Sequence, residues 1–177
     1  MDTDAQEATE ETIFTGDDLM TGPPSPLVPP ELAPQILDGV ELCSSHLRKL
    51  FECLHKNDIE PFCQDEIVIY HRCSQNRDAT VRRKMYKAEE TLGRVLPDDL
   101  LQERLAKLKA DMTLLERRFL LASGLEGVEG FRQRWTLNGQ FQDTKNRMES
   151  LEKGVVASKQ QQETEAAPSR KAWWHVW

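Results

Sequence analysis

Basic residues are missing from the start of this 177-residue chain, where ten acidic side chains occur before Arg48, the first lysine or arginine. This composition is the opposite of an arginine-rich matrix presequence and lacks the basic start of a secretory signal, so we expect no cleaved targeting peptide. Aromatic residues make up only 7% of the chain, and the mean hydropathy is -0.61. So polar a chain has little material for a deep globular core, and we expect helices that pack on helices.

Long apolar runs are also missing. The run at 119–122 ("FLLA") is far shorter than the roughly 20 residues that span a bilayer, so we expect at most peripheral membrane contact. No phosphate-binding glycine loop, HExxH, nucleophile elbow or CxxC occurs, and we expect neither enzyme activity nor a cofactor. The acidic balance and the lack of a known binding module disfavour nucleic acid as a partner.

The chain divides into four predicted regions and an all-α fold. Residues 1–35 combine acids with six prolines and predict a disordered arm. Residues 36–96 predict two helices that carry all four cysteines, the second of which ends before Pro97. Residues 97–156 predict a second helical hairpin, and residues 157–177 predict a disordered tail with a tryptophan-rich end.

The second hairpin is predicted by two apolar seams with alternating spacings of four and three. They consist of Leu101, Leu105, Leu108, Met112, Leu115 and Phe119, and of Leu137, Phe141, Thr144, Met148, Leu151 and Val155. A glycine-spaced loop joins the two segments, so we expect the seams to pair within the chain. Pairing with the helix of a partner protein remains the alternative.

The four cysteines form two pairs with nine residues between the members, Cys43 with Cys53 and Cys63 with Cys73. On a helix, residues ten apart lie roughly 15 Å apart along the axis. A disulfide needs Cα atoms about 4.4 to 6.8 Å apart, so no bond can form within either helix. Each cysteine must therefore bond to the other helix.

The register of an antiparallel hairpin selects the partners, because residues at the same level have numbers with a constant sum. The sums 43 plus 73 and 53 plus 63 are equal, and Asn57 and Asp58 lie at the midpoint, where a turn is needed. We therefore predict the links Cys43–Cys73 and Cys53–Cys63. The same register sets Leu47 against Ile69 and Leu54 against Phe62.

Both segments resemble the twin CX9C family, which has the coiled-coil-helix-coiled-coil-helix (CHCH) fold and occurs mostly in the mitochondrial intermembrane space. The resemblance covers about residues 40–75. It implies import without a presequence, oxidation by the intermembrane-space disulfide relay, and a non-enzymatic role as a subunit or assembly factor of a respiratory-chain complex. The basic segment that follows, "VRRKMYKAEE", is similar to that of twin CX9C accessory subunits of NADH dehydrogenase (complex I), which favours that complex.

The family resemblance also implies an import signal, which consists of a cysteine with apolar residues on its own helix face. The residues here that match are Leu47, Leu50, Phe51, Ile69 and Tyr70. At the end of the chain, Trp173, Trp174 and Trp177 are candidates for binding a partner, because tryptophan is enriched where proteins meet.

Three alternatives remain open. The first alternative is a cytosolic or nuclear coiled-coil adaptor with reduced cysteines, and the second is a copper carrier of the CHCH family. Cysteines ten apart on one helix cannot share an ion, but a mixed zinc or copper site at one end of the reduced hairpin is conceivable. Its ligands would be Cys43, His46, His71 and Cys73. We expect no metal site.

Overall fold

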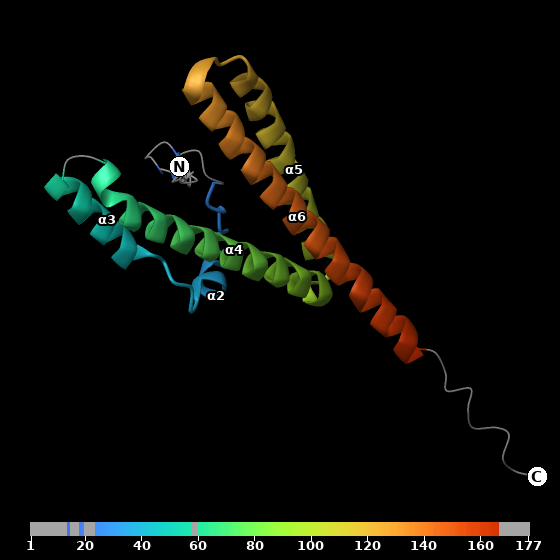
Figure 1. Ribbon diagram of the computed structural model, residues 1–177. Coiled ribbons are helices and arrows are strands. Elements are labelled where there is room, and N and C mark those ends of the chain that lie inside the picture. Colours follow the sequence, from blue (N-terminus) through green and yellow to red (C-terminus); the bar gives the residue numbers. More distant parts are fainter. Residues whose placement is uncertain (1–13, 15–17, 20–23, 58–59, 167–177) are drawn as a thin grey trace, which may run out of the picture. The chain divides into compact units, whose positions relative to one another are not determined.

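The computed structural model describes residues 14, 18–19, 24–57 and 60–166, and these residues form an all-α fold without a strand (Figure 1). The predicted fold class is therefore confirmed. None of the helices in these ranges is both long and apolar enough to cross a bilayer. The elements are α2 (Ala33–Leu37), α3 (Ser44–Asn57), the 3₁₀ turn η1 (Glu60–Cys63), α4 (Gln64–Val95), α5 (Asp98–Ser123) and α6 (Gly127–Ala166).

The chain folds into two compact units, and α4 contributes to both. The first unit contains Met1–Gly22 and Glu41–Arg77, and therefore α3, η1 and the start of α4. The second contains Pro23–Val40 and Asp78–Trp177, and therefore α2, the rest of α4, α5 and α6. All four cysteines belong to the first unit.

Local signals in the sequence explain where the helices of the first unit begin. The Leu47 amide donates to the Cys43 carbonyl at 3.0 Å, which closes the first turn of α3. Asp65 and Glu66 occupy the first turn of α4, where carboxylates favour the positive end of the helix dipole. The lysine and histidine in the last turn of α3, Lys56 and His55, suit its negative end in the same way.

In the second unit, α5 and α6 form the predicted antiparallel hairpin (Figure 1). Pro97 precedes α5, and the Gly124 amide donates to the Leu121 carbonyl at 3.2 Å where the helix ends. The seams meet in a core of Leu101, Leu108 and Leu151, which are 4%, 2% and 0% exposed. Both predicted seams therefore contribute buried residues to the same core.

The proline-rich segment differs from its prediction, because residues 24–35 are not a disordered arm. Leu32 and Ile36 are buried against Val81, Met85 and Ala88 of α4. The backbone of this segment also accepts hydrogen bonds, since Arg82 donates to the Pro24 carbonyl. The two buried aliphatic side chains and the hydrogen bond from Arg82 therefore dock this segment on α4.

The end of α6 also differs from its prediction, since the helix continues to Ala166 where disorder was expected from 157. The polar stretch 157–166 contains no glycine or proline and is rich in Ala, Gln, Glu and Lys, which have high helix propensity. A polar composition was mistaken for disorder, although a packed helix needs no new nucleus to continue.

A buried carboxylate joins three helices of the second unit. Glu89 of α4 is 0% exposed and accepts hydrogen bonds from Arg104 of α5 at 2.7 and 2.8 Å and from Arg147 of α6 at 2.8 and 3.0 Å. The hydrogen bond to Glu89 raises the pKa of Arg104. Since both oxygens are hydrogen-bonded, this triad compensates the cost of burying its charges.

A second polar cluster lies beside it. Asp143 of α6 is 8% exposed and accepts hydrogen bonds from Arg82 at 2.9 Å and from the Tyr86 hydroxyl at 2.7 Å. Burial raises the pKa of Tyr86, so the phenol keeps its proton and its donor role.

Two glycines allow α4 and α6 to cross at close range. A Cβ atom on Gly93 would lie 2.2 Å from the Leu151 carbonyl oxygen, and one on Gly154 would lie 2.1 Å from the Glu90 carbonyl oxygen. Gly154 therefore does not end α6, as a glycine often does, but provides space for the neighbouring backbone.

Replacing Gly93 or Gly154 by alanine should lower the free energy of unfolding by about 1–3 kcal/mol, because the helices must move apart. The measurement is chemical unfolding followed by circular dichroism. Gly124→Ala is the matched control, since its Cβ would meet only the Leu121 carbonyl oxygen at 3.6 Å. Equal effects at all three positions would contradict the close crossing.

Replacing Glu89 by glutamine should destabilise the second unit by about 3–5 kcal/mol, because two arginines lose their buried counter-charge. The neighbouring Glu90→Gln is the control, because Glu90 is 39% exposed in its side chain and pairs with Arg94 one turn away. An exposed pair of this kind contributes about 0–1 kcal/mol. A similar loss for both variants would show that the triad contributes little.

Candidate functional site: the disulfide hairpin and the α5–α6 tip

Two disulfides join the helices of the first unit, and they are the two links that the sequence predicts. Cys43 bonds to Cys73 and Cys53 bonds to Cys63, each pair with a Cα separation of 5.9 Å. The first link joins the start of α3 to α4, and the second joins α3 to η1. All four cysteines are therefore bonded.

The apolar core around these links is small. Its buried members are Leu50, Cys63 and Ile67, and Leu54 and Tyr70 are partly buried beside them. Burying one aliphatic side chain contributes only about 1.5–3 kcal/mol. A core of this size cannot offset the entropy of ordering two helices, so the first unit depends on its covalent links.

The residues of the predicted import signal divide between the core and the surface. Leu50 is buried and Leu47 and Tyr70 are half-buried, whereas Phe51 is 61% exposed and Ile69 is 49% exposed. The role of this set in import stays a prediction.

The sequence predicts that Leu47 faces Ile69 and that Leu54 faces Phe62, and the structure differs in part. Ile67, rather than Ile69, joins Leu50 in the core, and Phe62 is 70% exposed. The 3₁₀ turn η1 replaces the first turn of the expected helix and rotates Phe62 outwards.

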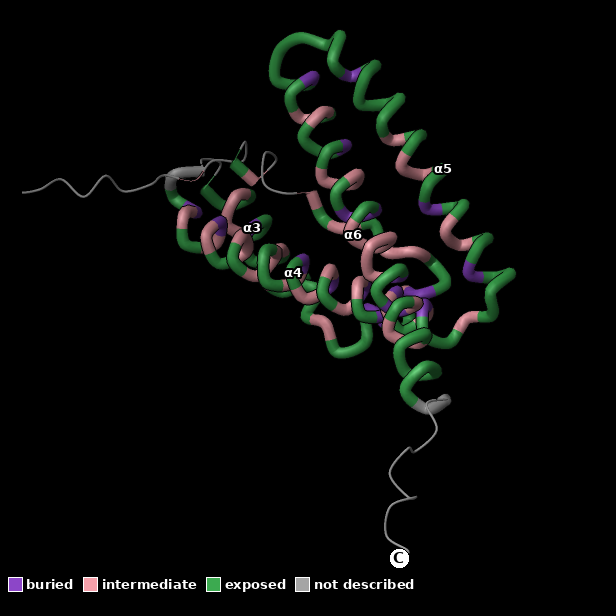
Figure 2. Tube along the Cα trace, turned by 90° about the vertical axis from the view of Figure 1, so that its right-hand side faces the viewer, coloured by how far each residue is buried: buried purple, intermediate pink, exposed green. Residues whose placement is uncertain are grey.

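The largest set of exposed apolar side chains lies where α5 meets α6. In Figure 2 the loop between the two helices and most of the neighbouring turns are coloured as exposed. We call this surface the hairpin tip, and it consists of Leu114, Phe119, Leu120, Leu121, Leu125, Val128, Phe131 and Trp135, which are 37% to 77% exposed. A concentration of exposed apolar side chains at one end of a hairpin is a candidate for an interaction site.

The hairpin tip is a well-ordered structure. Arg134 donates hydrogen bonds to the carbonyls of Ala122 and Leu125, and the rings of Phe131 and Trp135 stack with centroids 6.1 Å apart. Gly130 gives the loop space, because a Cβ there would lie 2.2 Å from the Leu125 carbonyl oxygen. The hydrogen bonds of Arg134 therefore connect the start of α6 to the end of α5 and to the loop.

A groove of about 390 Å³ runs between α5 and α6 beside the tip. Its lining includes Leu115, Phe119 and Leu120 of α5 and Phe141 of α6. The two helices also meet at this end, since Ala122 and Leu137 are 3% and 7% exposed, whereas Phe119 is 37% exposed. Part of the Phe119 side chain therefore remains available to a partner beside the groove.

The sequence analysis missed the hairpin tip, although one signal points to it. Phe119, Leu120 and Leu121 are consecutive, and on a helix Leu121 lies about 200° around the axis from Phe119. Three consecutive apolar side chains cannot all face one neighbouring helix. Apolar residues outside the seam, here Leu120 and Leu121, therefore indicate an additional apolar surface that does not face the neighbouring helix.

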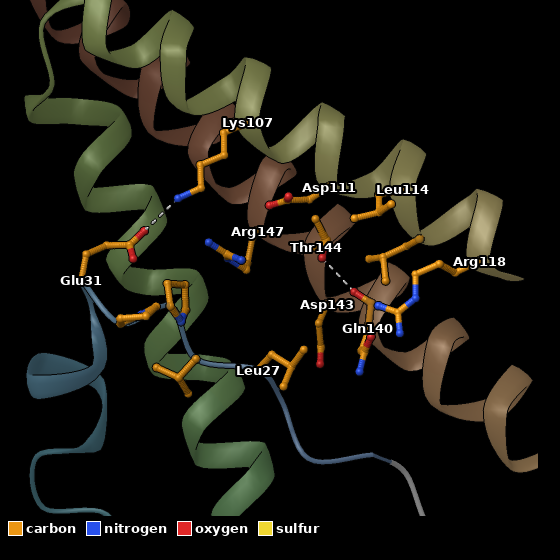
Figure 3. A pocket seen from close by; sticks show the side chains of 14 residues that line it. Leu27, Glu31, Lys107, Asp111, Leu114, Arg118, Gln140, Asp143, Thr144 and Arg147 are labelled. Carbon is orange, nitrogen blue, oxygen red and sulfur yellow. Dashed lines mark hydrogen bonds and ion pairs between the residues drawn. The ribbon is translucent and has the colours of Figure 1, made fainter.

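A second cavity of about 330 Å³ lies between residues 27–31, α5 and α6 (Figure 3). Its charged lining contains three cations and three anions, which are Lys107, Arg118 and Arg147 and Glu31, Asp111 and Asp143. Several of these already pair, as Lys107 does with Glu31 at 3.9 Å. A hydrogen bond with its own backbone lowers the pKa of Glu31, with a further contribution from Lys107.

This balanced lining does not select a charged ligand. The one hydroxyl group among the lining side chains, that of Thr144, donates to the Gln140 carbonyl at 2.8 Å (Figure 3). The lining includes no cysteine, histidine or serine, and thus no nucleophile with an adjacent base. The hairpin tip is therefore the better candidate for a functional surface. Trp173, Trp174 and Trp177 lie outside the described residues.

Removing either disulfide should destabilise α3 selectively. Cys43→Ala with Cys73→Ala opens a 30-residue separation and should cost on the order of 3–4 kcal/mol, whereas Cys53→Ala with Cys63→Ala opens a 10-residue separation and should cost on the order of 2–3 kcal/mol. Hydrogen exchange of the α3 amides measures this loss, and the α5 amides serve as the internal control. Unchanged protection of α3 would show that the apolar core alone suffices.

Comparison with known proteins gives one match. No curated protein and no solved structure is similar to the chain. A family model described as "Domain of unknown function (DUF7803)" matches residues 1–177. Because the match covers the whole sequence, the chain belongs to the DUF7803 family.

Proposed function

We propose that this protein is a non-enzymatic structural or assembly component of a respiratory complex of the mitochondrial inner membrane, with complex I as the favoured one. It acts in the intermembrane space, where the disulfide relay oxidises it. The observation that carries this proposal is the pair of disulfides between antiparallel helices, with nine residues between the cysteines of each segment.

The chemistry of the disulfides supports an oxidising compartment. Disulfides persist outside the reducing cytosol, and small helical units with little core depend on them. Cys43 and Cys63 are 1% and 0% exposed, so half of the sulfurs are out of reach of large reductants. Such buried links are typical of structural disulfides rather than catalytic ones.

The hairpin tip supports a role in binding another protein. The groove beside it combines four leucine and phenylalanine side chains with three polar ones, which are Glu116, Asn138 and Gln142. Such a lining suits an amphipathic partner helix. Arg117, Arg118 and Glu116 lie along the same turns of α5 and supply charges of both signs around the apolar surface. A mixed polar border around an apolar centre is the usual anatomy of a protein interface.

A cytosolic or nuclear adaptor is the second candidate, and one observation favours it. The hairpin tip belongs to the second unit, which contains no cysteine. Binding through the tip therefore needs no oxidised cysteine, and it would persist in a reducing compartment.

The two candidates are separated by a tagged chain expressed at its native level. Leu120→Glu with Leu121→Glu should abolish co-migration with a mitochondrial complex on native gels, because both leucines are more than 70% exposed and lie in the tip. Leu100→Glu is the matched control, since this leucine is 47% exposed at the other end of α5. Surface changes of this kind alter stability by about 0.5 kcal/mol or less.

The proposal fails if the wild-type protein fractionates with the cytosol or nucleus. It also fails if the tip variant and the Leu100 control co-migrate equally with the complex. Unchanged hydrogen-exchange protection of the α5 and α6 amides in the tip variant shows that any loss of binding comes from the surface and not from misfolding, because the tip lies in the unit without cysteines.

A further inference from the structure

Potential metal ligands lie close together around the Cys43–Cys73 disulfide. Ligand atoms of Glu41, His46 and Cys73 all lie within 4.8 Å of one another. His46 Nε2 lies 3.5 Å from Glu41 Oε1, and Cys43 is bonded to Cys73 at 2.10 Å. Two sulfurs, an imidazole and a carboxylate therefore share one small volume. Among the described residues, no other group of three such ligands comes together.

This donor set matches the preference of zinc, which binds cysteine, histidine and carboxylate ligands in a tetrahedron. Bonds of about 2.0–2.3 Å place the donors of such a site roughly 3.3–3.8 Å apart. The sulfurs would have to separate from 2.10 Å, and the other atoms would have to approach by only about an ångström from their present limit of 4.8 Å.

We propose that the reduced chain binds one zinc ion through Cys43, His46, Cys73 and Glu41. A dithiol reductant supplies two electrons and two protons to the Cys43–Cys73 bond and becomes a disulfide itself. The two thiols then release their protons when they bind the metal. Oxidation reverses the sequence and expels zinc, so the disulfide and the metal exclude each other at this site.

The proposed site contains one histidine, His46, and not the two of the mixed site that is conceivable from the sequence. The mixed site that is conceivable from the sequence includes His71, but the His71 ring contacts Phe14 at a centroid distance of 5.4 Å and its Nε2 lies 2.8 Å from Gln75 Nε2. His71 lies two residues from Cys73, and on a helix this turns its side chain about 200° away. Glu41 takes its place, at a position that spacing on a helix does not reveal.

Cys53 and Cys63, at the other end of the hairpin, allow a comparison with the proposed zinc site. The Asn57 side-chain nitrogen lies 3.1 Å from the Cys53 sulfur and 3.8 Å from the Cys63 sulfur. An amide nitrogen is a donor and a poor ligand, so among the described residues this end of the hairpin brings together two sulfurs and no third metal ligand. His55 is exposed on the same helix and belongs to no ligand cluster among the described residues.

The test uses the full chain, reduced with a phosphine under anaerobic conditions, and zinc in competition with a chromophoric chelator. One zinc should bind to the wild type and to Cys53→Ala with Cys63→Ala, and none with comparable affinity to Cys43→Ala with Cys73→Ala. His46→Ala should weaken binding about tenfold or more, because it removes a direct ligand, whereas His55→Ala and His71→Ala should not. Cobalt should give thiolate charge-transfer and tetrahedral ligand-field bands only where zinc binds.

A second measurement in the wild-type chain does not depend on how the variants fold. Zinc should slow alkylation of Cys43 and Cys73 and leave Cys53 and Cys63 reactive. Equal protection of all four thiols, or equal zinc affinity of the His46 and His55 variants, would overturn the proposal. The inference is independent of the proposed function, because a purified chain that binds no zinc leaves the partner and compartment untouched.

Discussion

The sulfur–sulfur bonds between α3 and the facing elements are the constraint on which the first unit depends. Residues at one level of an antiparallel pair have a constant sum, and both links obey it, so each bond reinforces the register that the other requires. Among the described residues, the buried core beside the links consists of Leu50, Cys63 and Ile67, with partly buried side chains such as Phe14 and Leu19 packed against it. The covalent bonds therefore supply order that apolar contacts alone do not, and they connect the stability of this unit to the redox state of its surroundings.

The second unit is held together by a different kind of interaction. Its helices meet at a buried carboxylate with two arginines and at a crossing where Gly93 and Gly154 bring backbones together. Neither feature responds to reductant. The stability of the first unit therefore depends on its disulfides, whereas the second unit, which contains no cysteine, presents the hairpin tip. At the Cys43–Cys73 disulfide, with Glu41 and His46 beside it, the proposed zinc site would couple the redox state of the cysteines to metal binding.

Predictions from the sequence succeeded where a periodic pattern or a geometric sum determines the outcome. The spacing of the cysteines predicted both links, and the seam from Leu101 predicted α5 with its end near Gly124. They failed where only the average polarity of a segment was used. The composition of residues 24–35 does not show that Leu32 and Ile36 pack against α4, and the composition of residues 157–166 does not show that α6 continues. Glu41 beside His46, and the role of Gly154, depend on tertiary contacts that no local pattern contains.

The most direct test of this account is a peptide map of the protein isolated from cells whose thiols are blocked at lysis. Trypsin cuts after Arg48, Lys49, Lys56, Arg72 and Arg77 and so places each cysteine on its own peptide. The account predicts, without reduction, one linked pair that joins Cys43 to Cys73 and another that joins Cys53 to Cys63. Blocked thiols at these cysteines in most molecules, or links that cross between the two levels, would contradict it.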